Sequence, residues 1–147
     1  MMLVRKATAS DIPWLLEKLR DHDELMGYKR KLFADENFAR NALIILLDRH
    51  VIFIAKEDGK NFGFIAGHLA GHPFNPAIRV LSEILWWTEP SFRGKRAASV
   101  LLSSFTKFGY EHVDSIICSH VYDKTGRASA LEKRGYRELE RAYLLEV

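Results

Sequence analysis

Cysteine is scarce in this chain, and long hydrophobic runs and a large excess of either charge are missing. One cysteine, Cys118, occurs in 147 residues, which excludes an internal disulfide framework and favours a reducing compartment. The longest aliphatic stretch, residues 42–47, is far too short to span a bilayer. The net charge of +3 suits a polyanionic small ligand but does not require a nucleic acid. The chain is therefore expected to be a soluble globular protein with neither a membrane nor a nucleic-acid partner.

The remaining composition is that of an ordinary globular domain. Hydrophobic residues make up 48% of the sequence and charged residues 28%, and 147 residues can bury a complete core. Arg5, Lys6 and Asp11 interrupt the N-terminal region before any long apolar run, so no secretory signal is expected. Repeats and low-complexity tracts are not visible. We expect one domain over residues 1–147 in the cytoplasm, and no metal site is indicated.

The most informative stretch extends from residue 83 to residue 102. A strand-like run, residues 84–88, meets Pro90, which cannot donate to a sheet ladder and so ends the strand. Residues 93–98 then lead into an apolar-periodic helix. A loop of small and basic residues that opens a helix presents unpaired N–H groups at the positive end of the helix dipole. The stretch predicts a phosphate or pyrophosphate site; the alternative is an ordinary strand-to-helix turn with solvated basic side chains. It fits neither the Walker A nor the Gly-x-Gly-x-x-Gly pattern.

Periodicity and turn residues predict the element order β-α-α-β-β-β-α-β-α-β. The expected strands are residues 3–7, 51–56, 62–69, 80–88, 115–122 and one or two within 136–145. The expected helices are residues 12–24, 35–49, 95–110 and 127–133, the second with an apolar face of Phe38, Ala42, Ile45 and Leu46. Thr8 and Asp11 should cap the first helix, which should end within residues 21–24 in an acidic segment reaching to about residue 34. Residues 72–76 are expected to form a loop.

Residues 93–98 resemble motif A of the GNAT family of N-acetyltransferases. There, Arg/Gln-x-x-Gly-x-Gly/Ala joins a central strand to a helix and holds the pyrophosphate of acetyl-CoA. The resemblance implies acetyl-CoA as co-substrate, bound here by Arg93, Gly94, Lys95, Arg96, Ala97 and Ala98. The first and last positions match the signature, whereas Arg96 replaces a glycine that lets the backbone approach the phosphates. Arginine at that place, with the preceding Trp-Trp-x-x-Pro, looks like the variant carried by small phage and prophage members.

A second segment supports the same resemblance. Residues 128–136 are similar to motif B of the family, Ala-x-x-Leu-Tyr-Glu-Lys-x-Gly-Phe, and follow motif A at a distance of about 40 residues. Gly135 is expected to cap the helix. The resemblance covers nearly the whole chain and implies the GNAT fold. That fold is of the α/β (α+β) class, with a mixed, mostly antiparallel central sheet that is flanked by helices and splayed at the central strand.

The resemblance also assigns the groups that would bind the acyl carbonyl. In this family, main-chain N–H groups freed at a bulge of the central strand bind the carbonyl and the pantetheine arm, and by alignment these belong to Trp87 and Thr88. Trp86 and Trp87 are expected on opposite faces of the sheet. Both are interpreted as core aromatics; the alternative is that one of them lines the acyl or amine pocket.

Glu83 is the candidate general base, acting directly or through a water. Family members often place a carboxylate on the central strand just before the carbonyl-binding groups, and partial burial would raise its pKa toward a useful value. The alternative is a strand-end carboxylate paired with a nearby Arg or Lys. The fallback bases are His68, His72 and His120, although each fits a surface or strand-edge histidine.

The family's general acid is a tyrosine that this chain lacks, because Leu131 occupies its position. Tyr122, at the end of the preceding strand, is the candidate replacement; otherwise the thiol departs with help from solvent. The family's asparagine, seven residues earlier, is Lys124 here. Four basic residues form a cluster that could bind the 3′-phosphate of coenzyme A: Lys124, Arg127, Lys133 and Arg134. The alternative is that they form a solvated face of a short helix.

Two functions therefore remain. The first is an N-acyltransferase that moves an acetyl group from acetyl-CoA directly to a primary amine of a small molecule or a protein. The second is a non-catalytic acyl-CoA-binding or protein-interaction module on the same fold, which the changes at Leu131 and Lys124 favour. An acidic segment, Asp21 to Glu24, would attract a cationic amine or would be merely solvated. The acceptor is not identified by the sequence, and family precedent favours a homodimer.

Overall fold

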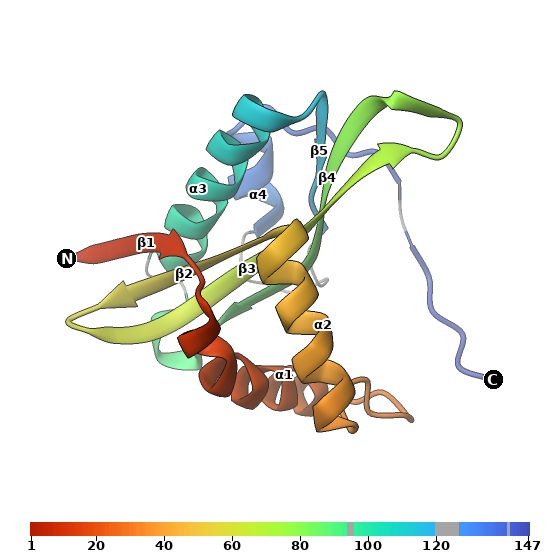
Figure 1. Ribbon diagram of the computed structural model, residues 1–147. Coiled ribbons are helices and arrows are strands. Elements are labelled where there is room, and N and C mark those ends of the chain that lie inside the picture. The colour runs from red at the N-terminus through yellow and green to blue at the C-terminus, as the bar shows by residue number, and fades with distance from the viewer. Residues whose placement is uncertain (94–95, 120–126, 141) are drawn as a thin grey trace.

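A central sheet of five strands organises the protein (Figure 1). The computed structural model describes residues 1–93, 96–119, 127–140 and 142–147, and of residues 127–129 it describes the backbone. Within these ranges the strands are β1 (Met2–Lys6), β2 (Val51–Glu57), β3 (Lys60–His72), β4 (Asn75–Thr88) and β5 (Ser115–Ile117), each beside the next in that order. The first three pairs are antiparallel and β4–β5 is parallel. The expected mixed, mostly antiparallel sheet is confirmed.

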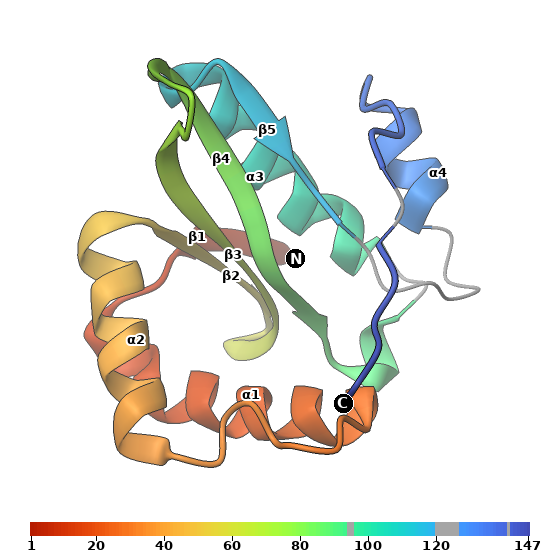
Figure 2. The same cartoon turned by 90° about the vertical axis from the view of Figure 1, so that its right-hand side faces the viewer.

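Helices cover both faces of this sheet (Figures 1 and 2). On one face lie α1 (Ile12–Met26) and α2 (Glu36–Arg49), whose Leu15 and Leu43 share a core cluster with Phe64 of β3. On the other lies α3 (Ala97–His112), whose Phe105 shares a second cluster with Leu81 of β4. A short helix, α4 (Arg127–Glu132), follows β5 in the chain. The two clusters are separated by the sheet, so each strand of the central part is buried on both faces.

Close approach of α3 to the sheet depends on one glycine. A Cβ atom at Gly67 of β3 would lie 2.5 Å from Cε2 of Phe105 and 2.7 Å from Cδ1 of Leu81. Any side chain there would force Phe105 out of its place, because both neighbours are fully buried. Gly67 therefore sets the distance between α3 and the central strands.

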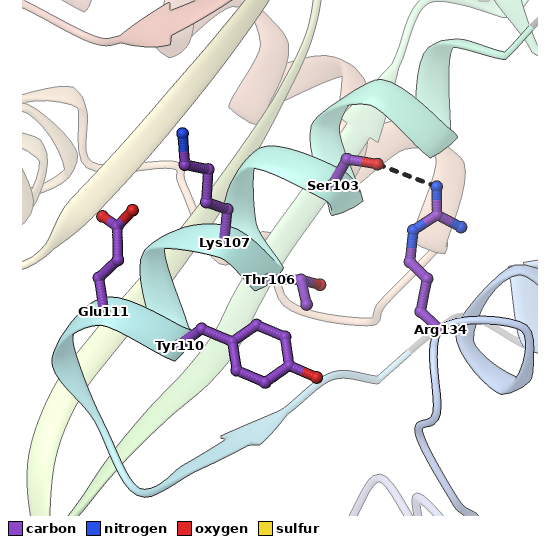
Figure 3. Close-up of a pocket in the computed structure, with 6 residues that line it drawn as sticks. All are labelled: Ser103, Thr106, Lys107, Tyr110, Glu111 and Arg134. Atoms are coloured by element: carbon purple, nitrogen blue, oxygen red, sulfur yellow. Dashed lines mark hydrogen bonds between the residues drawn. The ribbon is translucent and has the colours of Figure 1, made fainter.

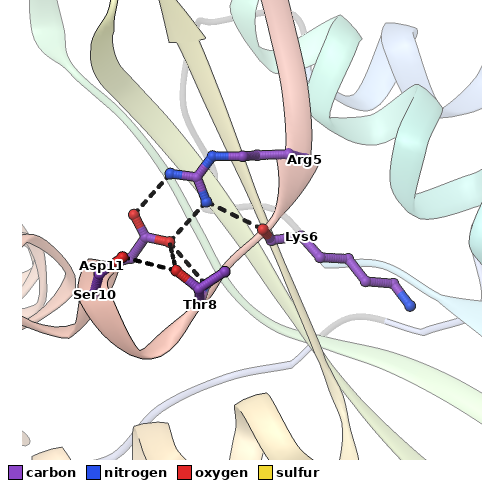
Figure 4. A network of polar contacts seen from close by, with 5 residues as sticks. All are labelled: Arg5, Lys6, Thr8, Ser10 and Asp11. Carbon is purple, nitrogen blue, oxygen red and sulfur yellow. Dashed lines mark hydrogen bonds and ion pairs between the residues drawn. The ribbon is translucent and has the colours of Figure 1, made fainter.

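The junction between β1 and α1 is fixed by a buried carboxylate (Figure 4). Asp11 accepts two hydrogen bonds from the Arg5 guanidinium, at 2.7 and 2.8 Å, and a third from the Thr8 N–H at 2.8 Å. These bonds outweigh the effect of burial and lower the pKa of Asp11 to about 2. The capping arrangement expected for Thr8 and Asp11 is confirmed, in a 3₁₀ turn (Ala9–Asp11) that leads into α1.

The prediction that the first helix ends within residues 21–24 is wrong. The helix continues to Met26 and ends at Gly27, which has the left-handed φ of +63° typical of a helix C-terminus. Asp23 lies inside the helix with 4% of its surface exposed, and its carboxylate accepts the N–H groups of Leu32 and Phe33 at 3.1 and 2.8 Å. The acidic segment thus organises the following loop, and it is not a free acidic rim.

Three further expectations need correction. In α2, Ala39 and Leu43 are buried, whereas Phe38 is 75% exposed and Ile45 51% exposed, so the helix turns a different face to the core. The loop expected at 72–76 is instead a tight turn between β3 and β4, since β4 begins at Asn75. The strands expected within 136–145 are absent from the described residues of that range, which have no assigned helix or strand.

Candidate functional site

The site is built where β4 parts from β5. The parallel pairing joins Val80 to Ser115, Leu81 to Ile116 and Ser82 to Ile117, and it ends there, while β4 continues to Thr88. Opposite β3, the register shifts between Ala66 and Gly67, which leaves Ile84 as the extra residue of a β-bulge. The expected splay at the central strand is confirmed. Beyond Ser82, the β5-facing edge of β4 carries no strand partner within the described residues.

One hydrogen bond shows which N–H groups of β4 point toward β3 and which point toward the open edge. The Glu89 N–H donates to the Phe62 carbonyl at 2.8 Å, so this pair is of the hydrogen-bonded kind in the antiparallel ladder. Because opposite pairs alternate in kind, the Trp87 N–H also faces β3, whereas those of Trp86 and Thr88 face the open edge. Of the two main-chain donors named from the sequence, the N–H of Thr88 faces the open edge and that of Trp87 faces β3. The N–H of Trp86 also faces the open edge.

The two tryptophans are buried on opposite faces of the sheet, as expected. Trp86 (6% exposed) joins the cluster beneath α3, and Trp87 (5% exposed) joins the cluster beneath α1 and α2. The Trp87 ring contacts His22 of α1 edge-on, with centroids 6.5 Å apart. The indole Nε1 of Trp87 and the hydroxyl of Thr88 are buried with no hydrogen-bond partner among the described residues. The end of β4 therefore holds polar groups that a bound molecule could satisfy.

The connection after β4 folds back on the strand. A 3₁₀ turn (Pro90–Phe92) stacks the Phe92 ring on Phe62, with centroids 4.5 Å apart. Arg93 then donates from Nε to the Thr88 carbonyl at 3.0 Å, and its guanidinium lies 4.9 Å from the centre of the Trp87 ring. Arg93 thus braces the loop against the strand end. Gly94 and Lys95, predicted as part of the pyrophosphate loop, lie outside the described residues.

Arg96, which stands where motif A has a glycine, has a left-handed backbone conformation. Its φ is +50° and its ψ −8°, a left-handed conformation that favours glycine. As the N-cap of α3 it accepts the Val100 N–H at 3.0 Å and supplies no side-chain cap. The first-turn N–H groups of Ala97 and Ala98 thus lie at the positive end of the helix, and the first turn carries no acidic residue. This arrangement suits an anion.

Glu83 lies at the fork between the strands. Its Oε2 accepts the Ser119 hydroxyl at 2.9 Å and the Ser119 N–H at 3.2 Å, from the chain just beyond β5. Ser119 thus positions the carboxylate across the fork. Among the fallback bases, His68 is exposed and packs on His50, with ring centroids 4.2 Å apart. His72 is the last residue of β3, and its Nδ1 accepts the Phe74 N–H. His120 lies outside the described residues.

Next to Glu83 lies a thiol that sequence reasoning did not use. Burial raises the pKa of the Cys118 thiol to about 12, and the negative charge of Glu83 adds to this effect. The thiol contacts the Tyr136 hydroxyl, which also bonds to the Thr106 hydroxyl at 2.8 Å. Leu131 is 7% exposed in the core beneath α3, so the position of the family's tyrosine is filled with an apolar side chain.

Most of the remaining residues predicted for the site fall outside the described part of the chain. Tyr122 and Lys124 lie outside the described residues. Arg127 begins α4, and its side chain is likewise outside the described part. Arg134, from the same predicted basic cluster, is described: its guanidinium donates to the Ser99 hydroxyl at 2.6 Å and to that of Ser103 at 3.0 Å. It therefore ties the chain after α4 to α3.

A shallow groove of about 380 Å³ lies along the outer side of α3 (Figure 3). Its lining consists of Ser103, Thr106, Lys107, Tyr110, Glu111 and Arg134. These residues come from the middle and end of α3 and from beyond α4, not from the end of β4 or the first turn of α3. The groove is therefore distinct from the site at the fork. No group of three potential metal ligands occurs among the described residues, and none of the described helices is long and apolar enough to cross a membrane.

A splayed β4 that leads through a basic loop into an uncapped helix defines an acyl-CoA N-acyltransferase fold. The sequence model described as the acetyltransferase (GNAT) family matches residues 14–136, and the chain belongs to that family. It is accordingly an N-acetyltransferase whose co-substrate is acetyl-CoA. No match was found among curated protein sequences.

Solved structures share the fold over nearly the full chain. A predicted acetyltransferase from Clostridium acetobutylicum, solved with acetyl-CoA, is 24% identical with a TM-score of 0.76, covering 99% of this chain and 96% of that one. AAC(6′)-Iy, in complex with the bisubstrate analogue CoA-S-monomethyl-acetylneamine, is 18% identical with a TM-score of 0.73, covering 100% and 98%. A ribosomal-protein-alanine N-acetyltransferase from Brucella melitensis is 13% identical with a TM-score of 0.73, covering 99% of both chains.

Proposed function

We propose that the protein transfers an acetyl group from acetyl-CoA directly to a primary amine of a small molecule or a protein. The observation that carries this proposal is the open edge of β4, which continues from Glu83 to Thr88 after the pairing with β5 has ended. The pantetheine arm would lie along that edge, with its carbonyls on the Thr88 and Trp86 N–H groups. The pyrophosphate would lie at the first turn of α3.

Direct transfer is favoured over a covalent acyl-enzyme on a cysteine. The nucleophilic form of cysteine is the thiolate, and Cys118 is the single cysteine of the chain. With a pKa of about 12, this thiol stays protonated at neutral pH. A ternary complex in which the amine attacks the thioester carbonyl therefore fits the residues better than a relay through Cys118.

Within this scheme, Glu83 acts as general base and takes the proton that the amine must lose. Ser119 holds one oxygen of the carboxylate, at 2.9 Å from the hydroxyl, which orients the group at the fork. Tyr122 would protonate the departing thiolate. Lys95 and Arg96 would add charge at the pyrophosphate, and Lys124 and Arg127 would meet the 3′-phosphate. Arg93 contributes by bracing the loop against Thr88.

Several finer assignments belong to the same proposal. Residues 1–147 would act as one domain in the cytoplasm, of the small phage and prophage type that Arg96 suggests. A homodimer follows family precedent, and no nucleic acid takes part. Two of the solved structures with this fold point to an amine acceptor. One was solved with a bisubstrate analogue that contains an aminoglycoside derivative, and the other is named for the alanine of a ribosomal protein. Both kinds of amine therefore belong in an acceptor screen.

The alternative is a module that binds acyl-CoA without turnover, and one observation favours it. Leu131 is buried in the core, so the family's acid is absent from its usual place. Calorimetry with acetyl-CoA, followed by a thiol-release assay over a panel of amines, separates the two. Binding with thiol release supports the transferase, whereas binding without release for every amine supports the module. A chain that does not bind acetyl-CoA at all would contradict both.

A further inference from the structure

A buried lysine joins α1 to the loop that follows β4. Lys18 is 7% exposed, and its ammonium group contacts the carboxylates of Asp21 at 3.1 Å and Glu17 at 3.2 Å, both on its own helix. A third carboxylate, that of Glu89, comes from the first residue after β4. Sequence reasoning missed this cluster, since Lys18 and Glu89 are far apart in the chain and neither belongs to a motif.

The contact with Glu89 is the one that holds two elements together. An ammonium ion removed from water is unfavourable unless it is paired and hydrogen-bonded. Burial by itself lowers the pKa of Lys18, but hydrogen bonds from Glu89, Asp21 and Glu17 reverse this and raise it overall. The side chains of Glu17 and Asp21 are 63% and 44% exposed, whereas that of Glu89 is 24% exposed. The interaction with Glu89 is therefore the least screened by solvent.

Glu89 stands where the loop begins. Its N–H donates to Phe62 of β3 at 2.8 Å, and its carbonyl accepts the Phe92 N–H at 2.9 Å to open the 3₁₀ turn. The preceding carbonyl, that of Thr88, accepts Nε of Arg93 at 3.0 Å. Main-chain bonds thus fix Glu89 to the sheet, and Lys18 fixes its side chain to α1. The direction in which the chain leaves β4 depends on both.

We propose that Lys18 is a positioning residue that, through Glu89, holds the start of the β4–α3 loop in the place where the loop binds the pyrophosphate of acetyl-CoA. This inference rests on the proposed donor site. Lys18 contacts neither the reacting atoms nor the first turn of α3; it acts by fixing the loop to a helix on the opposite face of the sheet. Donor affinity is thereby linked to α1, the helix whose His22 contacts Trp87 at the strand end.

The test removes the ammonium group and follows both the loop and the ligand. In Lys18→Met, amide hydrogen exchange over residues 89–93 should become faster, and acetyl-CoA should bind about 5-fold more weakly or worse by calorimetry. Acetyl-pantetheine, which lacks the pyrophosphate, should stay within about 2-fold of its wild-type affinity. Lys31→Met is the matched control. It removes an ion pair of 3.3 Å between Lys31 and Glu24 of α1, and it leaves the contact between Lys18 and Glu89 in place. It should change neither measurement.

Each outcome separates this inference from the proposed donor site. Faster exchange and weaker acetyl-CoA binding in Lys18→Met, with Lys31→Met unchanged, support the positioning role. If the wild-type protein binds acetyl-CoA and Lys18→Met binds it equally well, the positioning role is overturned, whatever the rate of amide hydrogen exchange. The proposed donor site is not affected by that result. A wild-type protein that does not bind acetyl-CoA overturns the donor site together with the inference, while the exchange data still report whether Lys18 holds the loop.

A second variant covers the case in which Lys18→Met does not fold. Glu89→Gln keeps the size of the side chain and leaves Lys18 with Asp21 and Glu17, so folding should survive. It should give the same faster exchange and the same loss of acetyl-CoA affinity. Lys18→Arg retains the positive charge and should keep most of the wild-type affinity for acetyl-CoA. If Lys18 acted only through the packing of its aliphatic stem, Lys18→Met and Lys18→Arg would bind acetyl-CoA equally well.

Discussion

Arg96 offers a test of the backbone at the start of α3 that is independent of any ligand. Its φ of +50° is left-handed, which costs a residue with a Cβ atom roughly 1–2 kcal/mol relative to the right-handed conformation. Glycine avoids that strain but loses about 0.5–1 kcal/mol through the greater freedom of its unfolded chain. Arg96→Gly should therefore be about 0.5 kcal/mol more stable than the wild-type protein.

Arg96→Ala is the matched variant, because it removes the same charge and keeps the Cβ atom. At a right-handed or extended position, alanine is the more stable of the two residues, by about 0.5–1 kcal/mol in a helix. With a left-handed φ the order reverses, and Arg96→Gly should exceed Arg96→Ala by about 0.5–1 kcal/mol in urea unfolding. If the alanine variant is equally stable or more stable, residue 96 does not have the left-handed conformation and the reasoning fails. Equal losses of acetyl-CoA affinity in both variants would assign the arginine's role to its charge.

Three further predictions concern single groups. Asp11 has its pKa lowered to about 2, so its ion pair with Arg5 is fully present above about pH 4 and is lost as the pH falls toward 2. Asp11→Asn should remove about 2 kcal/mol at neutral pH and flatten this acid limb in unfolding curves; an unchanged limb would contradict the assignment. Cys118 should react with a disulfide reagent at neutral pH far more slowly when folded than in urea, and rapid reaction of the native protein would restore the covalent route. Glu83→Gln should lower turnover by roughly 10- to 10,000-fold without changing acetyl-CoA affinity, and an unaltered pH–rate profile would move the base role elsewhere.

Local sequence signals predicted the strands from β1 to β4 and the strand-to-helix connection after β4. The strand–Pro–basic loop–helix pattern placed the end of β4 and the start of α3, because proline and the helical period act over a few residues. The splay and the family came from the resemblance in motifs A and B. The left-handed φ of Arg96 was not predicted, because the family's glycine at that position was read only as room for the backbone to approach the phosphates.

What the sequence could not predict depends on contacts between distant residues. The end of α1 was placed too early because Asp21 and Asp23 look like solvated terminus residues. Asp23 in fact accepts N–H groups from nine and ten residues ahead, and Asp21 joins a buried lysine. Periodicity alone cannot choose between the two apolar stripes of α2. The structure buries the stripe with Ala39 and leaves Phe38 exposed. The pairing of β4 with β3 decides which tryptophan N–H faces the open edge, because hydrogen-bonded and non-hydrogen-bonded pairs alternate along the two strands.

The open edge of β4 has a consequence for how this protein can change by mutation. The groups that the proposed binding mode uses along that edge are main-chain N–H groups, which every residue except proline possesses. In the proposed binding mode, a substitution between Glu83 and Thr88 that keeps the strand folded would leave the hydrogen bonds to pantetheine in place. Residues on the two faces of that strand are then free to respond to a new acceptor or a new core. If the donor binds as proposed, its recognition would tolerate substitution at positions where acceptor specificity could change.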